Sequence, residues 1–190
     1  MTYRIQNFGR MIFVGLLACQ GQLVVIELSE SAEATIEGQS TLGGLTELVG
    51  TLGFDGFTEM DISQSQDLVN QGVQPGDIET AYIASFSLSV VDPSDADLSF
   101  ISSLEIWVEA PDLERVLVAS QVEFPEGVSV VEFELEDVNL VDYVVSDSMK
   151  ITTDATGTVP AETVTIKADA TFEIGVTAQG ACNALSQVES

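Results

Sequence analysis

The sequence has no histidine and only two cysteines, and these scarcities exclude several kinds of site. Without histidine there can be no Ser-His-Asp or Cys-His nucleophile system and no histidine-ligated metal. Two cysteines, Cys19 and Cys182, cannot make a cysteine-rich zinc site. P-loop, G-x-G-x-x-G and G-x-S-x-G motifs are also absent. A hydrolase built on paired carboxylates therefore remains only as an alternative. A groove that cleaves sugars would be expected to contain more than the one tryptophan of this sequence.

Basic residues are scarce as well. The chain has 5 Lys and Arg against 31 Asp and Glu, which gives a formal net charge of −26. Such a surface repels phosphate backbones, so nucleic acid is excluded as a partner. Anionic lipid would be repelled too, and attachment to a membrane would therefore require acyl chains.

The first nineteen residues have the composition of an export signal. Arg4 and Arg10 are the only charges before Cys19, and the apolar run from Met11 ends at that cysteine. The run is too short for a transmembrane helix, which needs roughly 20 apolar residues. A basic start, a short apolar run and small residues before a cleavage point are typical of a secretory signal peptide.

The segment Leu16-Leu17-Ala18-Cys19 resembles the lipobox of bacterial lipoproteins. The resemblance implies that residues 1–18 are removed, that Cys19 carries a diacylglycerol on its sulfur, and that its new amino group is acylated. Gln20, where an Asp would favour the inner membrane, implies an outer-membrane anchor. The alternative is a plain signal peptide with a secreted domain. Cys182 is unpaired in the first case, and in the second it could form a disulfide with Cys19.

Hydrophobic periodicity predicts a mostly β protein, and it is clearest near the C-terminus. From Val164 to Ala178 apolar and polar residues alternate, which is the pattern of a half-buried strand. A second alternating stretch, residues 149–154, precedes it, and residues 156–162 supply turn chemistry. We therefore expect a long antiparallel hairpin at this end of the domain.

Other apolar alternations indicate further strands and a single domain over residues 19–190. Shorter candidates lie at residues 23–26 and 116–119. The fold class that follows is an antiparallel β-sandwich with one or two short helices. One helix is predicted after Ser40 over residues 41–52, and another from the capping pattern Ser63-Gln64-Ser65-Gln66 to Gly72. The apolar faces of the longer strands comprise Tyr82, Phe86, Leu88 and Val90; Leu98, Phe100, Leu104, Ile106 and Val108; and Val131, Phe133 and Leu135.

Two places are candidate binding sites. Asp92, Asp95 and Asp97 put three carboxylates in one turn, which suits the several oxygen ligands that Ca²⁺ requires. The alternative is a solvated turn whose carboxylates accept hydrogen bonds from nearby amides. By alternation Trp107 lies on the polar face of its strand. It is either a recognition anchor or is covered by the helix predicted over residues 41–52.

The leading functional hypothesis is a non-catalytic, membrane-anchored domain with a binding or structural role in the cell envelope. An envelope protein or a polysaccharide is the expected partner, and no cofactor is expected apart from the candidate Ca²⁺. The alternatives are a calcium-dependent adhesion or matrix module and the carboxylate-dependent hydrolase.

Overall fold

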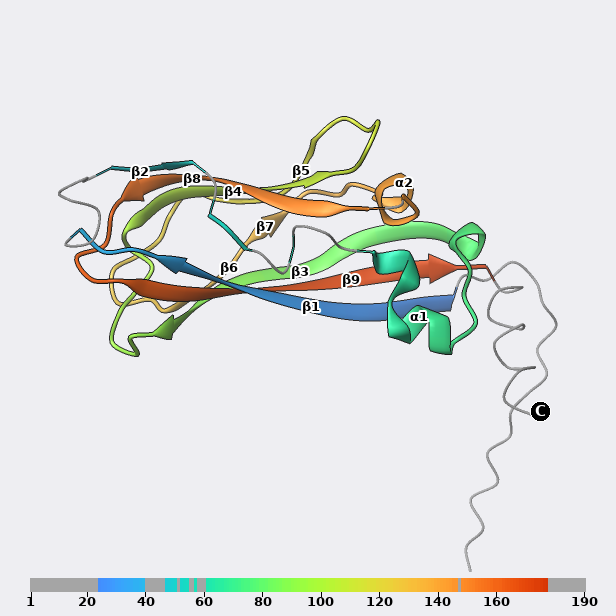
Figure 1. Ribbon diagram of the computed structural model, residues 1–190, viewed down its shortest axis with the longest axis horizontal. Helices are drawn as coiled ribbons and strands as arrows, with labels where there is room; N and C mark the ends of the chain where they lie inside the picture. The colour runs from blue at the N-terminus through green and yellow to red at the C-terminus, as the bar shows by residue number, and fades with distance from the viewer. Residues whose placement is uncertain are drawn as a thin grey trace, which may run out of the picture.

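The fold is a sandwich of two antiparallel sheets, in a computed structural model that describes residues 24–39, 47–50, 52–54, 57, 61–146 and 148–177 (Figure 1). This confirms the predicted fold class. Sheet A has the order β1 (Val24–Ile36), β9 (Val164–Val176), β3 (Ile78–Asp92) and β6 (Val130–Glu132). Sheet B has the order β2 (Glu47–Gly50), β8 (Lys150–Thr158), β4 (Ile101–Glu109), β5 (Val116–Gln121) and β7 (Glu134–Leu135).

Strand β9 confirms the alternation that predicted it. Every second side chain from Val164 to Val176 is buried, because β9 lies between β1 and β3 in sheet A and turns one face to the core. Strand β1 pairs with it over 13 residues, from Val24 opposite Val176 to Ile36 opposite Val164. The short strand predicted at residues 23–26 is thus the beginning of a much longer one.

The predicted C-terminal hairpin is wrong, because β8 and β9 lie in different sheets. Strand β8 pairs with β2 and β4, whereas β9 pairs with β1 and β3. The connection between them crosses from one sheet to the other, and Val159 and Pro160 within it are buried. Alternation shows that one face of each strand is buried, but a crossing of the sandwich buries the same faces as a hairpin would.

In β3 a bulge moves Tyr82 away from the face on which the alternation placed it. The pairing of β3 with β9 shifts register between Ile83 and Ser85. Ala81 and Ile83 are therefore buried on the same side as Phe86, while Tyr82 is half-buried on the opposite side. A bulge inserts one residue, so the apolar phase before it differs from the phase after it.

Two other predicted faces are confirmed in part. In β4 Leu104, Ile106 and Val108 are fully buried, but Leu98 and Phe100 are buried within the preceding turn and not in the strand. Val131 and Phe133 are buried, and the chain changes sheets at Phe133, between β6 and β7. Leu135, which follows that change of sheet, is 37% exposed.

The helix predicted over residues 41–52 is wrong over its described part. Residues 47–50 form strand β2, which pairs with the outer edge of β8. Gly50 has a φ of 128°, a backbone conformation that only glycine adopts readily. Glycines within the segment lower helix propensity, and pairing with β8 satisfies the same backbone groups. Residues 40–46 lie outside the described residues.

The second predicted helix is confirmed but is shorter. A 3-10 turn (Ile62–Gln64) precedes helix α1 (Gln66–Asn70), and another (Pro75–Asp77) leads into β3. Ser65 caps α1, since its Oγ accepts a 3.4 Å hydrogen bond from the amide of Leu68. The helix ends just before Gly72, whose positive φ of 67° is typical of a residue that terminates a helix. Helix α2 (Val141–Val144) had no predicted counterpart.

A buried threonine joins the segment after β2 to sheet B. The hydroxyl of Thr153 in β8 accepts a 2.8 Å hydrogen bond from the Leu52 amide and donates a 3.1 Å bond to the Leu52 carbonyl. Thr153 is only 1% exposed and Leu52 only 5%. The Leu52 carbonyl also accepts a 3.0 Å hydrogen bond from the Phe54 amide, so it is the buried Leu52 amide that depends on Thr153 for a partner.

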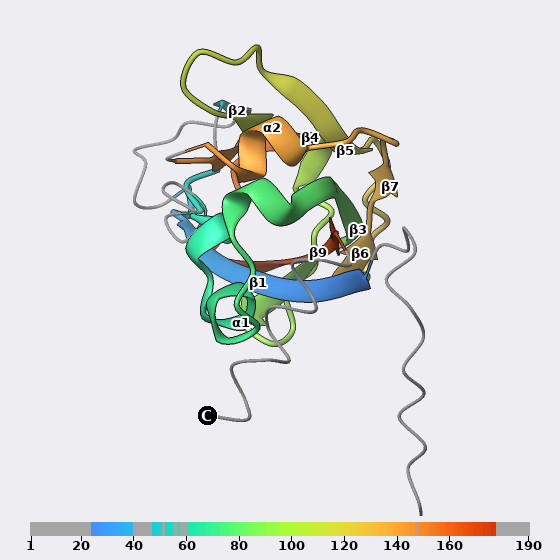
Figure 2. The ribbon, with the colours of Figure 1, turned by 90° about the vertical axis from the view of Figure 1, so that its right-hand side faces the viewer.

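The two ends of the sandwich differ. Strand β1 begins beside the last residue of β9, and Figures 1 and 2 show α1 and α2 at this end. We call it the N-terminal end of the sandwich. The other end carries the β3–β4 and β8–β9 connections. From Val176 to Val164 there are twelve residue steps of about 3.4 Å, so the two ends lie about 40 Å apart.

Candidate functional site

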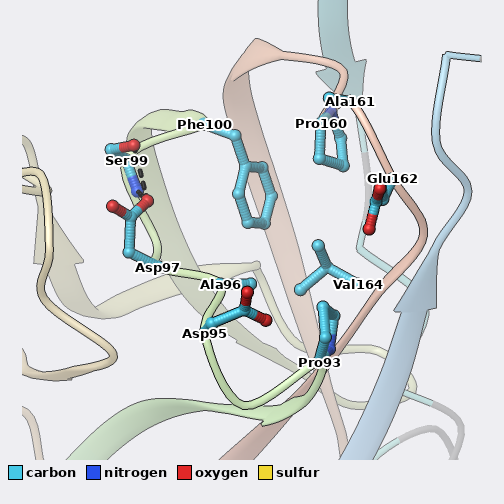
Figure 3. Close-up of a pocket in the computed structure, with 10 residues that line it drawn as sticks. All are labelled: Pro93, Asp95, Ala96, Asp97, Ser99, Phe100, Pro160, Ala161, Glu162 and Val164. Atoms are coloured by element: carbon cyan, nitrogen blue, oxygen red, sulfur yellow. Dashed lines mark hydrogen bonds between the residues drawn. The ribbon is translucent and has the colours of Figure 1, made fainter.

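An open hollow of about 440 Å³ lies at the end opposite the start of β1 (Figure 3). The β3–β4 connection forms one side and the β8–β9 connection the other. Phe100, Pro160, Val164 and Pro93 form an apolar centre, and the carboxylates of Asp95 and Glu162 stand at its sides. The remaining lining residues are Ala96, Asp97, Ser99 and Ala161.

Asp97 is engaged with backbone amides and does not point into the hollow as a free ligand. Its Oδ1 accepts hydrogen bonds from the Ser99 hydroxyl (2.6 Å) and amide (3.0 Å), and its Oδ2 accepts one from the Gly127 amide (2.6 Å). The bonds from the Ser99 hydroxyl and from the Gly127 amide lower the pKa of Asp97. Asp97 thus joins the β3–β4 connection to the turn before β6.

The three carboxylates predicted to hold Ca²⁺ are not gathered at one point. Asp95 and Asp97 line the hollow, whereas Asp92 is the last residue of β3. Within the described ranges, no group of three or more His, Cys, Asp or Glu side chains is arranged to hold a metal ion. The calcium hypothesis stays a prediction, and Asp97 makes the amide contacts of the alternative, solvated turn.

The hollow combines apolar and acidic groups at an open surface. Enzymes that use carboxylates as acids and bases tune them by burial and by close charged neighbours. Asp95 and Glu162 are exposed, and the hollow is open to water. An apolar centre with hydrated carboxylates at its sides fits a cationic or amphipathic surface.

Trp107 lies half-buried on the outer face of sheet B, as alternation predicted. Its Nε1 donates a 3.3 Å hydrogen bond to Glu105, and the guanidinium of Arg115 stands 4.4 Å from the ring centroid. The helix that was expected to cover this tryptophan does not form over the described residues 47–50. The cover is instead Arg115, in a cation–π contact.

An ion-pair network holds Arg115 in place beside that ring. Arg115 contacts Glu109 at 3.2 Å and Asp154 at 2.9 Å, and Glu109 also contacts Lys150 at 2.8 Å. The hydrogen bond from Lys150 is the main cause of a lowered pKa of Glu109. Sequence reasoning missed this network, although Arg115 is the only arginine after Arg10 and so was a detectable signal.

The lipidation candidate Cys19 and the second cysteine, Cys182, lie outside the described residues. Among the helices of the described ranges, none has the length and apolar character needed to cross a membrane.

Comparison with known proteins gives structural neighbours only. No family model and no curated protein matches the sequence. Among solved structures, the chain is similar to the decameric BFDV capsid protein, with 9% identity, a TM-score of 0.43, and coverage of 82% of this chain and 99% of that one. The 60-mer of the same capsid protein gives 10% identity, a TM-score of 0.37, and coverage of 83% and 94%. Likeness at this level carries no argument about function.

Proposed function

We propose that this protein is a lipid-anchored, non-catalytic binding domain of the cell envelope. Cys19 is the point of attachment, residues 1–18 are the signal peptide, and an envelope protein is the partner class. The anchor is proposed to lie in the outer membrane.

The observation that carries the proposal is the short distance between Cys19 and the folded domain. Strand β1 begins at Val24, five residues later, and five residues span at most about 18 Å when fully extended. An acylated Cys19 would therefore hold the N-terminal end of the sandwich next to the bilayer. The hollow would then face away from the membrane, about 40 Å further out.

The charge of the domain supports the same arrangement. Without Arg4 and Arg10 the domain has 3 Lys and Arg against 31 Asp and Glu, a net charge of −28 that repels an anionic lipid surface, so the protein needs covalent acyl chains to stay at the membrane. The same charge favours solvation of the surface of the domain.

The composition and the hollow support a non-catalytic role. The sequence holds no histidine for nucleophile activation, and the carboxylates of the hollow are exposed. Binding a partner requires neither a histidine that activates a nucleophile nor a buried carboxylate.

The test is fractionation of cells that express the full chain or its Cys19→Ala variant, with Cys182→Ser as the matched control. The proposal expects the wild type and Cys182→Ser to float with membranes in detergent-free gradients, and Cys19→Ala to lose this membrane association. If Cys19→Ala floats as the wild type does, the anchor is not at Cys19 and the proposal fails.

A further inference from the structure

The outer edge of β1 is a long and regular strand edge. All 13 residues of β1 pair with β9 in one unbroken register, whereas the pairing of β3 with β9 shifts at three places. Bulges, prolines, short length and charged side chains are the usual means by which proteins blunt a free edge. Of these, strand β1 has only the charges, on Glu27, Glu30 and Glu33.

Within the described part of the chain, β1 ends sheet A, and no other strand pairs with its outer edge. An edge of this kind offers a row of backbone N–H and C=O groups to an added strand. Main-chain hydrogen bonds would give such a strand its affinity, and the side chains along β1 would decide which strand fits.

The side chains along β1 favour a basic strand. Glu27 and Glu33 lie on its solvent-facing side, six residues apart. Glu27 stands directly opposite Glu173 of β9, and like charges in this position destabilise a sheet. No cation in the described ranges forms an ion pair with either glutamate of this pair. Lys167 lies opposite Glu33, but its ammonium contacts Asp169 at 2.6 Å.

The same side chains oppose pairing with a second copy of the chain. A full-length antiparallel pairing of two β1 strands centres on Glu30. It sets Glu27 of one copy against Glu33 of the other, and Glu30 against itself. All three contacts join like charges, so a strand of opposite charge fits this edge better.

We propose that the free edge of β1 binds an extended segment of a partner protein as an added strand. The segment carries lysine or arginine at two positions six residues apart, where they face Glu27 and Glu33. This inference rests on the proposed function for its partner class, an envelope protein. Binding at the edge does not require the acyl anchor, so the two proposals can fail separately.

The test uses the processed protein, purified in detergent, and a labelled 13-residue peptide of alternating threonine and valine with lysine at positions 4 and 10. Fluorescence anisotropy measures affinity, and hydrogen exchange locates the contact. We expect the wild type to bind the peptide and to gain protection in the β1 amides. The double variant Glu27→Lys/Glu33→Lys should lose at least tenfold in affinity and prefer the matching peptide with glutamate in place of lysine.

Two controls separate strand addition from general charge attraction. Glu132→Lys/Glu134→Lys makes the same change in net charge away from β1 and should keep most of the affinity. A peptide N-methylated along its pairing edge keeps the lysines but cannot donate main-chain hydrogen bonds, so it should not bind. If the double variant at β1 unfolds, Glu27→Gln/Glu33→Gln replaces it and should also weaken binding.

Several results would overturn the inference. They are equal binding by the two lysine double variants, retained binding of the N-methylated peptide, or protection elsewhere than in β1. A dimer in sedimentation that tightens in Glu27→Lys, which would put a lysine opposite Glu33 of the other copy, would assign the edge to a second copy instead. None of these results depends on whether Cys19 is acylated, which fractionation measures independently.

Discussion

The hydroxyl of Thr153 should contribute substantially to the free energy of unfolding. It satisfies both the amide and the carbonyl of Leu52, at 2.8 and 3.1 Å, in a part of the core where both residues are almost fully buried. Thr153→Val keeps the shape of the side chain and removes the hydroxyl. The Leu52 carbonyl keeps its 3.0 Å bond from the Phe54 amide, but the buried Leu52 amide is left without a partner, at a cost of about 1–3 kcal/mol.

We therefore expect Thr153→Val to lower the free energy of unfolding by about 2 kcal/mol. At about 2–4 °C per kcal/mol for a chain of this size, the melting temperature should fall by about 4–8 °C. Thr153→Ser is the matched control, because it keeps the hydroxyl and loses one methyl group, at about 1 kcal/mol.

Urea unfolding followed by circular dichroism measures both variants, and hydrogen exchange at the Leu52 amide reports the local effect. The reasoning is refuted if Thr153→Val is as stable as Thr153→Ser. That result would mean that the segment after β2 is held by apolar packing alone.

Three further predictions concern charged groups. Asp97→Asn should destabilise the fold by about 1 kcal/mol at pH 7, because bonds to a charged acceptor are stronger than bonds to a neutral one, while Asp95→Asn should have no effect. Since the pKa of Asp97 is lowered by folding, its contribution is present above about pH 4 and is lost as the pH falls further, so acid unfolding curves of wild type and Asp97→Asn should converge. Arg115→Met should change the emission of Trp107, the single tryptophan, and cost about 1 kcal/mol in urea unfolding; Lys167→Met should leave the emission unchanged. Ca²⁺ and Mg²⁺ should raise the melting temperature equally by screening the net charge, and a larger shift with Ca²⁺ in calorimetry would contradict this reading of Asp97.

The sequence predicts the faces of the strands well and their neighbours poorly. The alternation in β9 identifies its buried side chains because burial of one face imposes a period of two. The same alternation does not reveal that β8 and β9 belong to different sheets, since each strand buries one face in either arrangement. Tyr82 is misplaced for a different reason, because the prediction carried one phase of alternation through a bulge that shifts the phase by one residue.

The candidate sites follow the same division. Local chemistry predicts that a carboxylate in the turn after β3 binds backbone amides, and Asp97 does so within a few residues along the chain. Its bond to Gly127, 30 residues away, depends on how the connections meet at the end of the sandwich. The cover of Trp107 is closer along the chain, because Arg115 lies eight residues further on, just before β5, the strand that pairs with β4. The ion pair of Arg115 with Asp154 of β8, 39 residues away, depends on a strand order that the sequence does not reveal.

The intact mass of the protein extracted from native membranes in detergent, with and without reduction, tests the central claim most directly. The account predicts a chain that begins at Cys19, carries the mass of a diacylglycerol and an amide-linked acyl group, and does not change on reduction. A soluble, unacylated chain that gains two hydrogens on reduction would contradict it, and would indicate a secreted domain closed by a Cys19–Cys182 disulfide. A chain that still carries residues 1–18 would contradict both the lipid anchor and the signal peptide.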